Sequence, residues 1–326
     1  MIFSLAPMAT LSHEGLRRLI HSFGDPDEYY AEMIQATSYL TGGRFESWYT
    51  RTAPDVSKIV WQLTCGTSEP LIEAAKQIST LGGAGIDINM GCCAPPILRQ
   101  GAGFSWVTKE REETLSMLNK VKATLPNMRL SVKTRLGVSD KDPELMYENL
   151  LSFCKQLVDC GVELITIHPR TSKEKLKHLS KWQYVKRIAK DLPIKIIGNG
   201  DIHSASEAIK KVNDNNLSGA MIGRQAVTYP WIFAQINKLK ENCPDEFEVN
   251  LEDTGLLFLE YLQESQPPEF YTSRAHRFFF YFCDNLKFAH YLKMKIQNVE
   301  TLTEIEKIWK EYFLENPTEK IKITKN

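Results

Sequence analysis

One short segment holds the residue best suited to chemistry. Cys92 lies in Asn89-Met-Gly-Cys-Cys-Ala-Pro-Pro96, a stretch rich in glycine and proline rather than in apolar residues. A cysteine in such a loop differs from the inert cysteines that fill protein cores, and its thiol can act as a nucleophile or as a proton donor. A hydrolase would want a histidine beside the thiol, whereas a reductase would need only its proton. The residues alone leave both chemistries open.

Other polar residues follow short apolar runs in the first part of the chain. If those runs are parallel strands joined by helices, their carboxyl ends meet at one end of a barrel, where the working residues of such enzymes lie. We therefore expect one site built by most of the strands. The residues at these positions are Pro7 and Met8, Glu32, Gln62, Asn89 and Cys92, Lys133 and Arg135, His168 and Arg170, Asn199-Gly200-Asp201, and Gly223-Arg224.

Lys133 comes directly out of the run Leu130-Ser-Val-Lys133, so the stem of its side chain should be buried. A buried ammonium group is costly unless it is paired or used. It can hold the edge of a flavin ring, on which negative charge gathers during reduction, or it can form a salt bridge with a barrel carboxylate. His168 and Gln62 also have two interpretations, because each can be a hydrogen-bonded residue of the interior rather than a ligand contact.

Two glycine-containing segments predict a phosphate site. Gly198-Asn-Gly-Asp201 and Ile222-Gly-Arg-Gln225 follow the last two predicted strands, which is the usual location of a phosphate in such barrels. Their glycines let backbone N–H groups approach a ligand, and Arg224 adds a charged, bidentate donor. Either segment alone could be an ordinary glycine turn, but the two together favour phosphate.

The elements that must position these residues alternate between strand and helix over residues 1–236. Such alternation implies parallel strands joined by helices, and eight strands with eight helices predict an α/β fold, the (β/α)8 TIM barrel. A doubly wound sheet is the alternative, although it usually has fewer strands. The predicted strands are Ile2–Ala6, Tyr29–Ile34, Ile59–Thr64, Gly85–Asn89, Arg129–Lys133, Leu164–His168, Ile194–Gly198 and Gly219–Gly223. Asp142-Pro143 and Ser204 with Glu207 predict two helix starts.

The pattern changes after residue 236. Residues 237–253 are polar and acidic and predict a linker, and strand signals vanish beyond it. Residues 254–326 predict a small C-terminal helical-bundle domain, in which Pro267-Pro268 separates the first helix from the second. The predicted helices are Leu256–Leu262, Ser273–Leu286, Phe288–Gln297 and Thr303–Leu314.

The charge balance argues against a nucleic-acid partner unless cations gather locally. The chain has 40 Lys+Arg and 40 Asp+Glu, whereas a nucleic-acid binder usually has a basic excess. Two stretches are nevertheless basic, since residues 170–190 contain eight Lys/Arg and one acidic residue, and residues 274–295 contain five Lys/Arg against Asp284. Each is either a nucleic-acid footprint or a solvated helix face.

The seven cysteines include no CxxC pair, so neither a disulfide framework nor a metal site of thiolates is expected. Reduced thiols fit the cytoplasm. The N-terminus shows no signal peptide, and no apolar run approaches the roughly 18 residues of a membrane span. We expect a cytoplasmic monomer that does not bind a membrane.

The order of the motifs resembles the tRNA-dihydrouridine synthase family. They are Ala6-Pro-Met8, Gln62, Asp87-Ile-Asn-Met-Gly-Cys92, Gln100-Gly-Ala-Gly103, Val132-Lys-Thr-Arg135, Ile165-Thr-Ile-His168 with Arg170-Thr171, Gly198-Asn-Gly-Asp201, Gly223-Arg224 and Pro230-Trp-Ile-Phe233. The resemblance spans residues 5 to about 235. The Asn-x-Gly-Cys loop with the later Gly-Ala-Gly is fairly specific, whereas the lysine, histidine and phosphate motifs are shared with other FMN barrels.

The resemblance implies an FMN-bound TIM barrel that reduces the C5=C6 bond of uridine in tRNA, with NADPH as the reductant and tRNA bound by the helical domain. It implies that Cys92 is the proton donor and that Asn89, Arg135 and Arg170 contact the substrate. By position, Pro7, Met8, Gln62, Lys133 and His168 would contact the flavin ring. Asn199, Gly200, Asp201, Gly223 and Arg224 would surround the phosphate.

Some residues depart from the pattern of the family. Cys93 replaces the usual proline, Thr10 replaces glycine and His13 replaces aspartate. Residues 173–178 replace an arginine, a tyrosine and a glycine that the family usually shows ahead of Trp182. These changes affect the expected contacts with the substrate, and with them the uridine position. The alternative functions are an FMN-dependent oxidoreductase of a small pyrimidine or enone, and a non-catalytic RNA-binding descendant.

Overall fold

The computed structural model describes residues 1–125, 127–174, 177–243 and 246–324. These residues form a nine-stranded parallel sheet, whose order is β2-β1-β9-β8-β7-β6-β5-β4-β3. The strands are β1 (Ile2–Leu5), β2 (Glu28–Tyr30), β3 (Ile34–Gln35), β4 (Ile59–Thr64), β5 (Gly85–Met90), β6 (Arg129–Arg135), β7 (Leu164–His168), β8 (Lys195–Asn199) and β9 (Gly219–Ile222).

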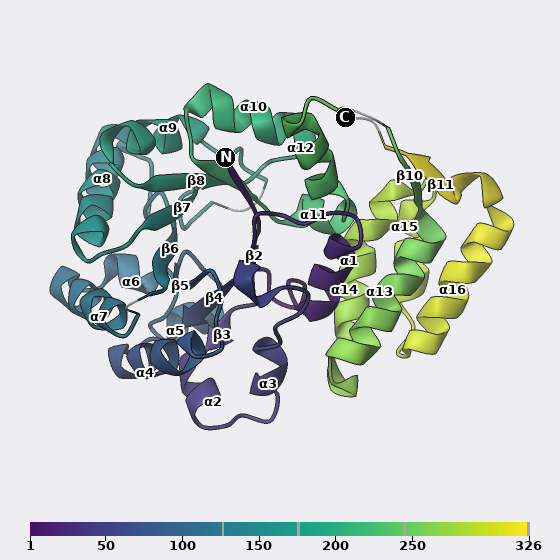
Figure 1. The fold of residues 1–326 in the computed structure, drawn as a ribbon, viewed down its shortest axis with the longest axis horizontal. Coiled ribbons are helices and arrows are strands. Elements are labelled where there is room, and N and C mark those ends of the chain that lie inside the picture. The colour runs from purple at the N-terminus through teal and green to yellow at the C-terminus, as the bar shows by residue number, and fades with distance from the viewer. Residues whose placement is uncertain (126, 175–176, 244–245, 325–326) are drawn as a thin grey trace.

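The sheet closes on itself. β1 pairs with both β9 and β2, and β2 pairs in parallel with β4 through Tyr29 with Ile59 and Tyr30 with Val60. Because β2 and β3 both pair with β4, they occupy one position in the ring, and the described strands form an eight-position barrel (Figure 1). The predicted (β/α)8 barrel is therefore confirmed, and the doubly wound alternative is excluded by the closure.

The predicted strand Tyr29–Ile34 is divided in the structure. Glu32 lies in the gap between β2 and β3 and is buried. Its carboxylate accepts hydrogen bonds from the backbone N–H of Thr10 at 2.6 Å and from Nη1 of Arg274 at 2.6 Å. Both partners lie outside the sheet, so the chain leaves the strand pairing here to meet them. The other predicted strands agree with the structure to within two residues at each end.

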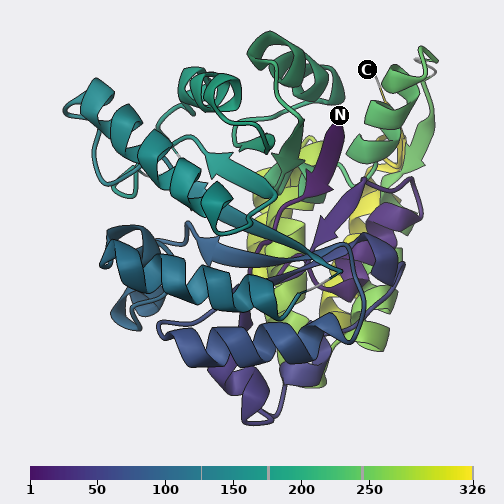
Figure 2. The same ribbon diagram turned by 60° about the vertical axis from the view of Figure 1, so that its left-hand side comes forward.

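Helices cover the outside of the barrel, as Figure 2 shows. They begin as expected at two places, because Asp142 Oδ1 accepts from the N–H of Leu145 at 3.1 Å and Ser204 Oγ accepts from the N–H of Glu207 at 3.1 Å. The α-helices are α1 (Glu14–His21), α2 (Ala36–Leu40), α3 (Glu46–Tyr49), α4 (Ser68–Ser79), α5 (Pro95–Arg99), α6 (Ser105–Thr108), α7 (Arg111–Ala123), α8 (Pro143–Asp159), α9 (Trp182–Asp191), α10 (Ala205–Asn215), α11 (Arg224–Thr228) and α12 (Ile232–Lys240), with a 3-10 turn η1 (Val56–Lys58).

The rest of the chain is mainly helical. Its elements are β10 (Glu248–Asn250), α13 (Leu251–Ser265), η2 (Pro268–Phe270), α14 (Tyr271–Phe282), η3 (Cys283–Asn285), α15 (Ala289–Gln297), α16 (Leu302–Glu315), η4 (Pro317–Glu319) and β11 (Ile321–Ile323). β10 and β11 pair antiparallel, which the sequence did not indicate. The predicted linker, residues 237–253, contains the end of α12, the strand β10 and the start of α13. The division into domains stays a prediction.

Aromatic side chains hold the C-terminal helices together. The rings of Phe258 and Phe278 stack with centroids 3.7 Å apart, and the ring of Phe279 lies 4.8 Å from that of Trp309. Gly255 lets the ring of Trp309 pack directly on α13, because a Cβ at this position would lie 2.4 Å from Nε1 of Trp309. A tightly packed aromatic core of this kind is a large source of stability.

The C-terminal helices contact the barrel through α1 and α14. A Cβ on Gly15 would lie 3.0 Å from Oγ of Ser265 and 3.1 Å from the carbonyl oxygen of Tyr261, so glycine lets α1 approach α13 closely. The ion pair between Glu32 and Arg274 joins the gap in the barrel wall to α14. Among the described residues, no helix has the length and apolar character needed to cross a membrane.

Arg274→Met should lower the free energy of unfolding by about 3–5 kcal/mol, because it leaves the Glu32 carboxylate buried without its charged partner. Urea denaturation followed by circular dichroism measures this loss. Arg277→Met is the matched control, since Arg277 is exposed on the same helix and should change the stability by no more than about 0.5 kcal/mol. Equal stability of the two variants would contradict the proposed importance of the ion pair.

Candidate active site

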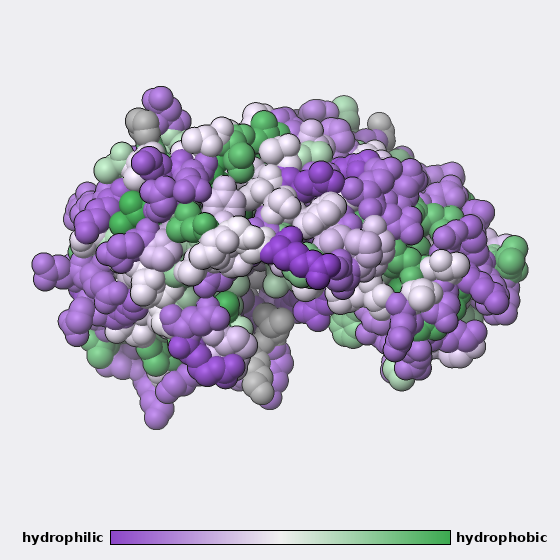
Figure 3. Space-filling view, turned by 90° about the horizontal axis from the view of Figure 1, so that it is seen from below, coloured by the Kyte–Doolittle hydropathy of each residue, from purple (hydrophilic) through white to green (hydrophobic). Residues whose placement is uncertain are grey.

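A cavity of about 930 Å³ opens where the strands of the barrel end. The space-filling view in Figure 3 shows a hollow in the outline between the barrel and the C-terminal helices. The structure brings most of the predicted site residues to the cavity wall, which confirms that one end of the barrel gathers them. Those at the wall are Pro7, Met8, Cys92, Lys133, Arg135, His168, Asn199, Gly200, Asp201, Gly223 and Arg224.

The loop that carries Cys92 is held from two sides. Asn89 Oδ1 accepts hydrogen bonds from the backbone N–H groups of Gly91 at 3.2 Å and of Cys92 at 3.0 Å. The carbonyl oxygen of Cys92 accepts from the N–H of Phe104 at 2.9 Å. Gly103 makes this second contact possible, because it has φ +61° and a Cβ there would lie 2.5 Å from that oxygen. The Gly-Ala-Gly motif therefore supports the cysteine loop.

Cys93, the neighbour of Cys92, also lies at the cavity wall. Its thiol donates to the carbonyl oxygen of Gly91 at 3.6 Å, and burial raises its pKa. Arg135 binds the same carbonyl through Nε at 2.9 Å and reaches the carbonyl of Thr171 through Nη1 at 3.1 Å. Arg135 thus joins the loop after β5 to the loop after β7.

Gln62 and Asn89 do not line the cavity but form a hydrogen-bonded chain beneath it. Gln62 is only 1% exposed, and its Oε1 accepts from Nδ2 of Asn89 at 2.8 Å. Its Nε2 donates to Oδ2 of Asp87 at 2.7 Å, and Oγ of Ser131 donates to Oδ1 of Asp87 at 2.7 Å. Burial raises the pKa of Asp87 to about 6. Only its place in the Asp87–Cys92 motif pointed to this aspartate, which was not among the predicted site residues.

Lys133 contributes a poorly compensated positive charge to the cavity. Burial, together with the charge of Arg135, lowers its pKa to about 8, while Asp87 and Cys92 act in the opposite direction. Over the described part of the chain, Lys133 forms no ion pair with a carboxylate, so the expected alternative of a barrel salt bridge is not found there. A cation held in this way is suited to an anionic ligand.

His168 is a neutral group at the cavity wall. Burial lowers its pKa to about 2, and the charges of Lys133 and Arg135 act in the same direction. Its Nε2 lies 2.8 Å from Nη1 of Arg170, which can only donate, so Nε2 accepts and the ring carries its proton on Nδ1. The imidazole therefore offers a hydrogen-bond donor and no positive charge.

Arg170 lies behind the cavity wall, although it was expected to contact the substrate. It is 1% exposed, and its Nη2 donates to both carboxylate oxygens of Asp201, at 2.6 and 2.7 Å. Its Nε also donates to the carbonyl oxygen of His178 at 2.7 Å. The guanidinium is directed inward because Asp201 and His168 bind it. It therefore holds two residues of the cavity wall in place and does not itself line the cavity.

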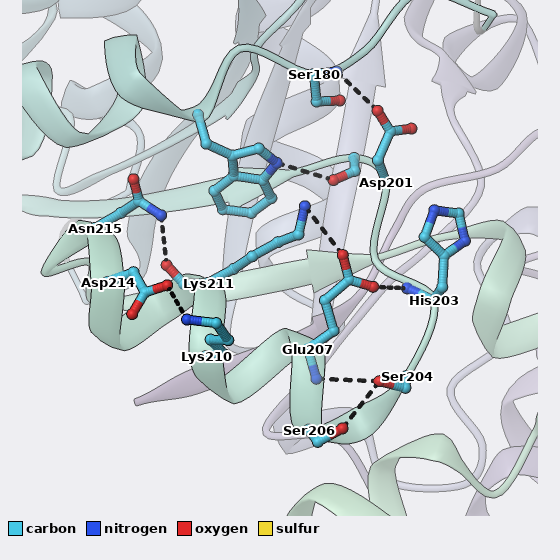
Figure 4. A network of polar contacts seen from close by, with 12 residues as sticks. Ser180, Asp201, His203, Ser204, Ser206, Glu207, Lys210, Lys211, Asp214 and Asn215 are labelled. Carbon is cyan, nitrogen blue, oxygen red and sulfur yellow. Dashed lines mark hydrogen bonds and ion pairs between the residues drawn. The ribbon is translucent and has the colours of Figure 1, made fainter.

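The predicted phosphate segment has a fixed conformation. Gly200 has φ +125°, and a Cβ there would lie 2.6 Å from Oγ of Ser180. Asp201 has φ +50°, and its Oδ2 accepts from the N–H of Ser180 at 2.7 Å, the contact drawn in Figure 4. The next residues are anchored to α10, since the N–H of His203 donates to Glu207 at 2.7 Å. Arg224 stays 43% exposed at the cavity, 3.8 Å from Asp201.

Part of the cavity wall comes from residues that the sequence did not assign to the site. Arg277, Tyr281 and Asp284 belong to α14 and η3 of the C-terminal helices. Arg277 and Asp284 appeared only within a basic stretch, because helical periodicity shows which face of a helix is apolar but not where the helix docks. Residues Ser172, Lys173 and Glu174, after β7, also line the cavity. Lys175 and Leu176, in the same divergent segment, lie outside the described residues.

Comparison with known proteins shows the family to which the chain belongs. A family model described as dihydrouridine synthase (Dus) matches residues 4–316. The chain is 28% identical over 238 residues to a probable tRNA-dihydrouridine synthase 1 of Synechocystis sp., a match that covers 71% of this chain and 63% of that protein. It is 30% identical over 270 residues to a probable tRNA-dihydrouridine synthase of Aquifex aeolicus, covering 79% of this chain and 78% of that protein.

The fold also resembles solved structures of distant proteins. A morphinone reductase mutant in complex with tetrahydroNAD superposes with a TM-score of 0.52 at 10% identity, over 75% of this chain and 88% of the reductase. At this level of identity the likeness concerns the fold alone.

Gly103→Ala should displace the Cys92 loop, because the new methyl group would meet the carbonyl oxygen of Cys92. Gly101→Ala is the matched control: Gly101 has a similar φ of +69°, but a Cβ there would meet no atom closer than 3.8 Å. Both variants carry the backbone strain of an alanine at positive φ, of order 1–3 kcal/mol. Only Gly103→Ala should also change the rate at which iodoacetamide alkylates Cys92, measured by peptide mass spectrometry. Equal rates in the two variants would show that Gly103 does not position the loop.

Proposed function

The chain belongs to the dihydrouridine synthase family, and we propose that it reduces the C5=C6 bond of uridine in tRNA, with bound FMN and with NADPH as the reductant. The observation that carries this proposal is the position of Cys92. Its loop is fixed by Asn89 and Gly103 at the wall of a cavity that is also lined by the half-buried cation of Lys133. A thiol and an anion-binding group facing one cavity are what a flavin-dependent reduction of a pyrimidine needs.

FMN fits the residues that are present. The cavity volume of about 930 Å³ lies within the range of roughly 300–1,000 Å³ that is usual for ligand sites. We assign Lys133 and the Nδ1–H of His168 to the polar edge of the ring, and Pro7 and Met8 to its face. Asn199, Gly200, Asp201, Gly223 and Arg224 would hold the phosphate. Gln62, which lies beneath the cavity wall, would support the site through its hydrogen bond with Asn89. When bound, the flavin supplies the hydride that is added to C6 of the uracil.

Carbon C5 then needs a proton, and we assign this step to the thiol of Cys92. His168 cannot provide the proton near neutral pH, because with a pKa of about 2 it is neutral and its remaining N–H is very weakly acidic. The thiol of Cys93 is already directed at the carbonyl oxygen of Gly91. We therefore propose that Cys92 is the general acid and that Asn89 keeps its loop in place, while Arg135 contacts the substrate at the cavity wall.

We assign tRNA binding chiefly to the C-terminal helices, as a helical domain. In the basic stretch 170–190, Arg170, Lys181 and Arg187 are engaged by carboxylates, which reduces their value for phosphate contacts. In the stretch 274–295, Arg274 and Lys293 are likewise paired with carboxylates. The difference is that Arg277 reaches the cavity and that Tyr291 is 56% exposed beside Lys295. Basic groups next to exposed aromatic rings suit phosphates and unstacked bases. Such a substrate would place the enzyme in the cytoplasm.

Cys92→Ala should keep its bound flavin but form dihydrouridine about 10²–10⁴-fold more slowly, because the reaction loses its general acid. Mass spectrometry of unmodified tRNA incubated with enzyme and NADPH measures the product, and the flavin absorbance of the purified variant measures the cofactor. Cys93→Ala is the control and should retain most of the activity. Normal turnover by Cys92→Ala would remove this residue from the mechanism.

The affinity of the apoprotein for FMN should fall as the pH rises through about 8, where free Lys133 loses its charge, by up to tenfold for each pH unit above that value. Lys133→Arg should flatten this dependence because arginine stays charged. Fluorescence titration with FMN between pH 6.5 and 9.5 measures the affinity. Riboflavin should show the same fall, since we assign Lys133 to the ring and not to the phosphate. A pH-independent affinity in the unmodified protein would argue against that assignment.

A further inference from the structure

We propose that Asp87 is a positioning residue, whose carboxylate sets the direction of a hydrogen-bond chain through Gln62 and Asn89 to the Cys92 loop. The chain crosses from β5 to β4 and back to β5, and it runs from the middle of the barrel to the loop at its end. The consequence for catalysis rests on the proposed function of Cys92. The geometry of the hydrogen-bond chain is independent of that proposed function.

The direction follows from the number of donors and acceptors that each group has. An ionised carboxylate can only accept hydrogen bonds, so Gln62 must present its NH₂ group to Oδ2 of Asp87, at 2.7 Å. Its carbonyl oxygen is then left for Asn89, which must present its own NH₂ group, at 2.8 Å. Oδ1 of Asn89 is the remaining atom, and it faces the N–H groups of Gly91 and Cys92.

A chain of two amides has one alternative arrangement, in which both amides are turned over. The NH₂ group of Asn89 would then face the N–H groups of Gly91 and Cys92, donor against donor. Those two backbone groups would lose their acceptor, and the loop would have to move to find another. The carboxylate of Asp87 excludes this arrangement, because it cannot donate to the carbonyl oxygen of Gln62.

Asp87 has the properties that this role requires. Its side chain is fully buried, and its other oxygen is occupied by the hydroxyl of Ser131 at 2.7 Å. Its pKa, raised by burial to about 6, leaves it mainly ionised at neutral pH. Lys133 and Arg129 on β6 contribute favourable charge. An aliphatic residue would avoid the cost of burying a carboxylate at this position.

The carboxylate does not line the cavity and so acts only through other groups. Neither Asp87 nor Gln62 reaches the wall, whereas Cys92 does. The chain therefore transmits a hydrogen-bond polarity, and not a charge or a proton, from the barrel interior to the reacting group. An asparagine at position 87 would have nearly the same shape but could donate to Gln62, which would permit the reversed arrangement.

The test compares Asp87→Asn with the double variant Asp87→Asn/Gln62→Glu. In the double variant the carboxylate at position 62 accepts from the amides at positions 87 and 89, so Asn89 again presents its oxygen to the loop. We expect Asp87→Asn to lower kcat for tRNA reduction by up to about a hundredfold, with little change in KM. We expect the double variant to recover most of that loss, which a merely structural role of Asp87 would not produce.

A second measurement separates this inference from the proposed function. The rate of alkylation of Cys92 by iodoacetamide, mapped by mass spectrometry, should change in Asp87→Asn and return toward the original value in the double variant. This result would support the proposed role of the hydrogen-bond chain even if Cys92→Ala proved active in tRNA reduction. Identical alkylation rates in all three proteins would overturn the inference and leave the role of Cys92 intact.

Whether each variant folds also tests the inference. If Asp87→Asn fails to fold while the double variant folds and reduces tRNA, the direction of the chain is what the protein requires, and the inference stands. If the double variant is folded but as slow as Asp87→Asn, or if neither variant folds, a carboxylate is needed at position 87 for another reason and the inference is overturned. Thermal unfolding followed by circular dichroism reports the folded state of each protein.

Discussion

Closure of the barrel turns every second side chain of each strand toward one interior, because successive residues of a strand face opposite sides. In this protein part of that interior is polar, because Asp87 accepts hydrogen bonds from both Gln62 and Ser131. Enclosed polar groups need hydrogen-bond partners, and here the partners lead through Asn89 to the loop of Cys92. The location of the Cys92 thiol therefore depends on contacts made well below the cavity.

Much of this architecture was predictable from local pattern. Parallel strands share one direction, so residues that end successive apolar runs, such as Lys133 and His168, had to meet at one end of the barrel. What could not be predicted depends on distant partners. Arg170 turns inward because Asp201 receives it, and Gln62 is covered because Asp87 and Asn89 bind it. The contribution of α14 to the cavity depends on how helices dock, which periodicity does not encode.

The electrostatic character of the cavity differs from that of the whole chain. Equal numbers of acidic and basic residues gave no reason to expect an anion site. The only acidic group of the two segments predicted to bind phosphate, Asp201, is neutralised from behind by Arg170, while Lys133 and Arg224 face the cavity. The neutral imidazole of His168 adds a donor without adding charge. Local pairing, rather than composition, thus produces a positive field where a ligand would bind.

The ion pair between Glu32 and Arg274 joins residues 242 positions apart, and this separation has a consequence for biosynthesis. Glu32 leaves the ribosome long before Arg274 is translated, and a carboxylate without its partner resists burial. The wall segment around Glu32 therefore gains its charged partner only after α14 has emerged. A nascent chain that has made all the barrel strands still has, in its wall, a carboxylate without its charged partner, and incompletely packed intermediates of this kind are prone to aggregation and recruit chaperones. The C-terminal helices thus supply a contact that the barrel wall lacks until late in synthesis.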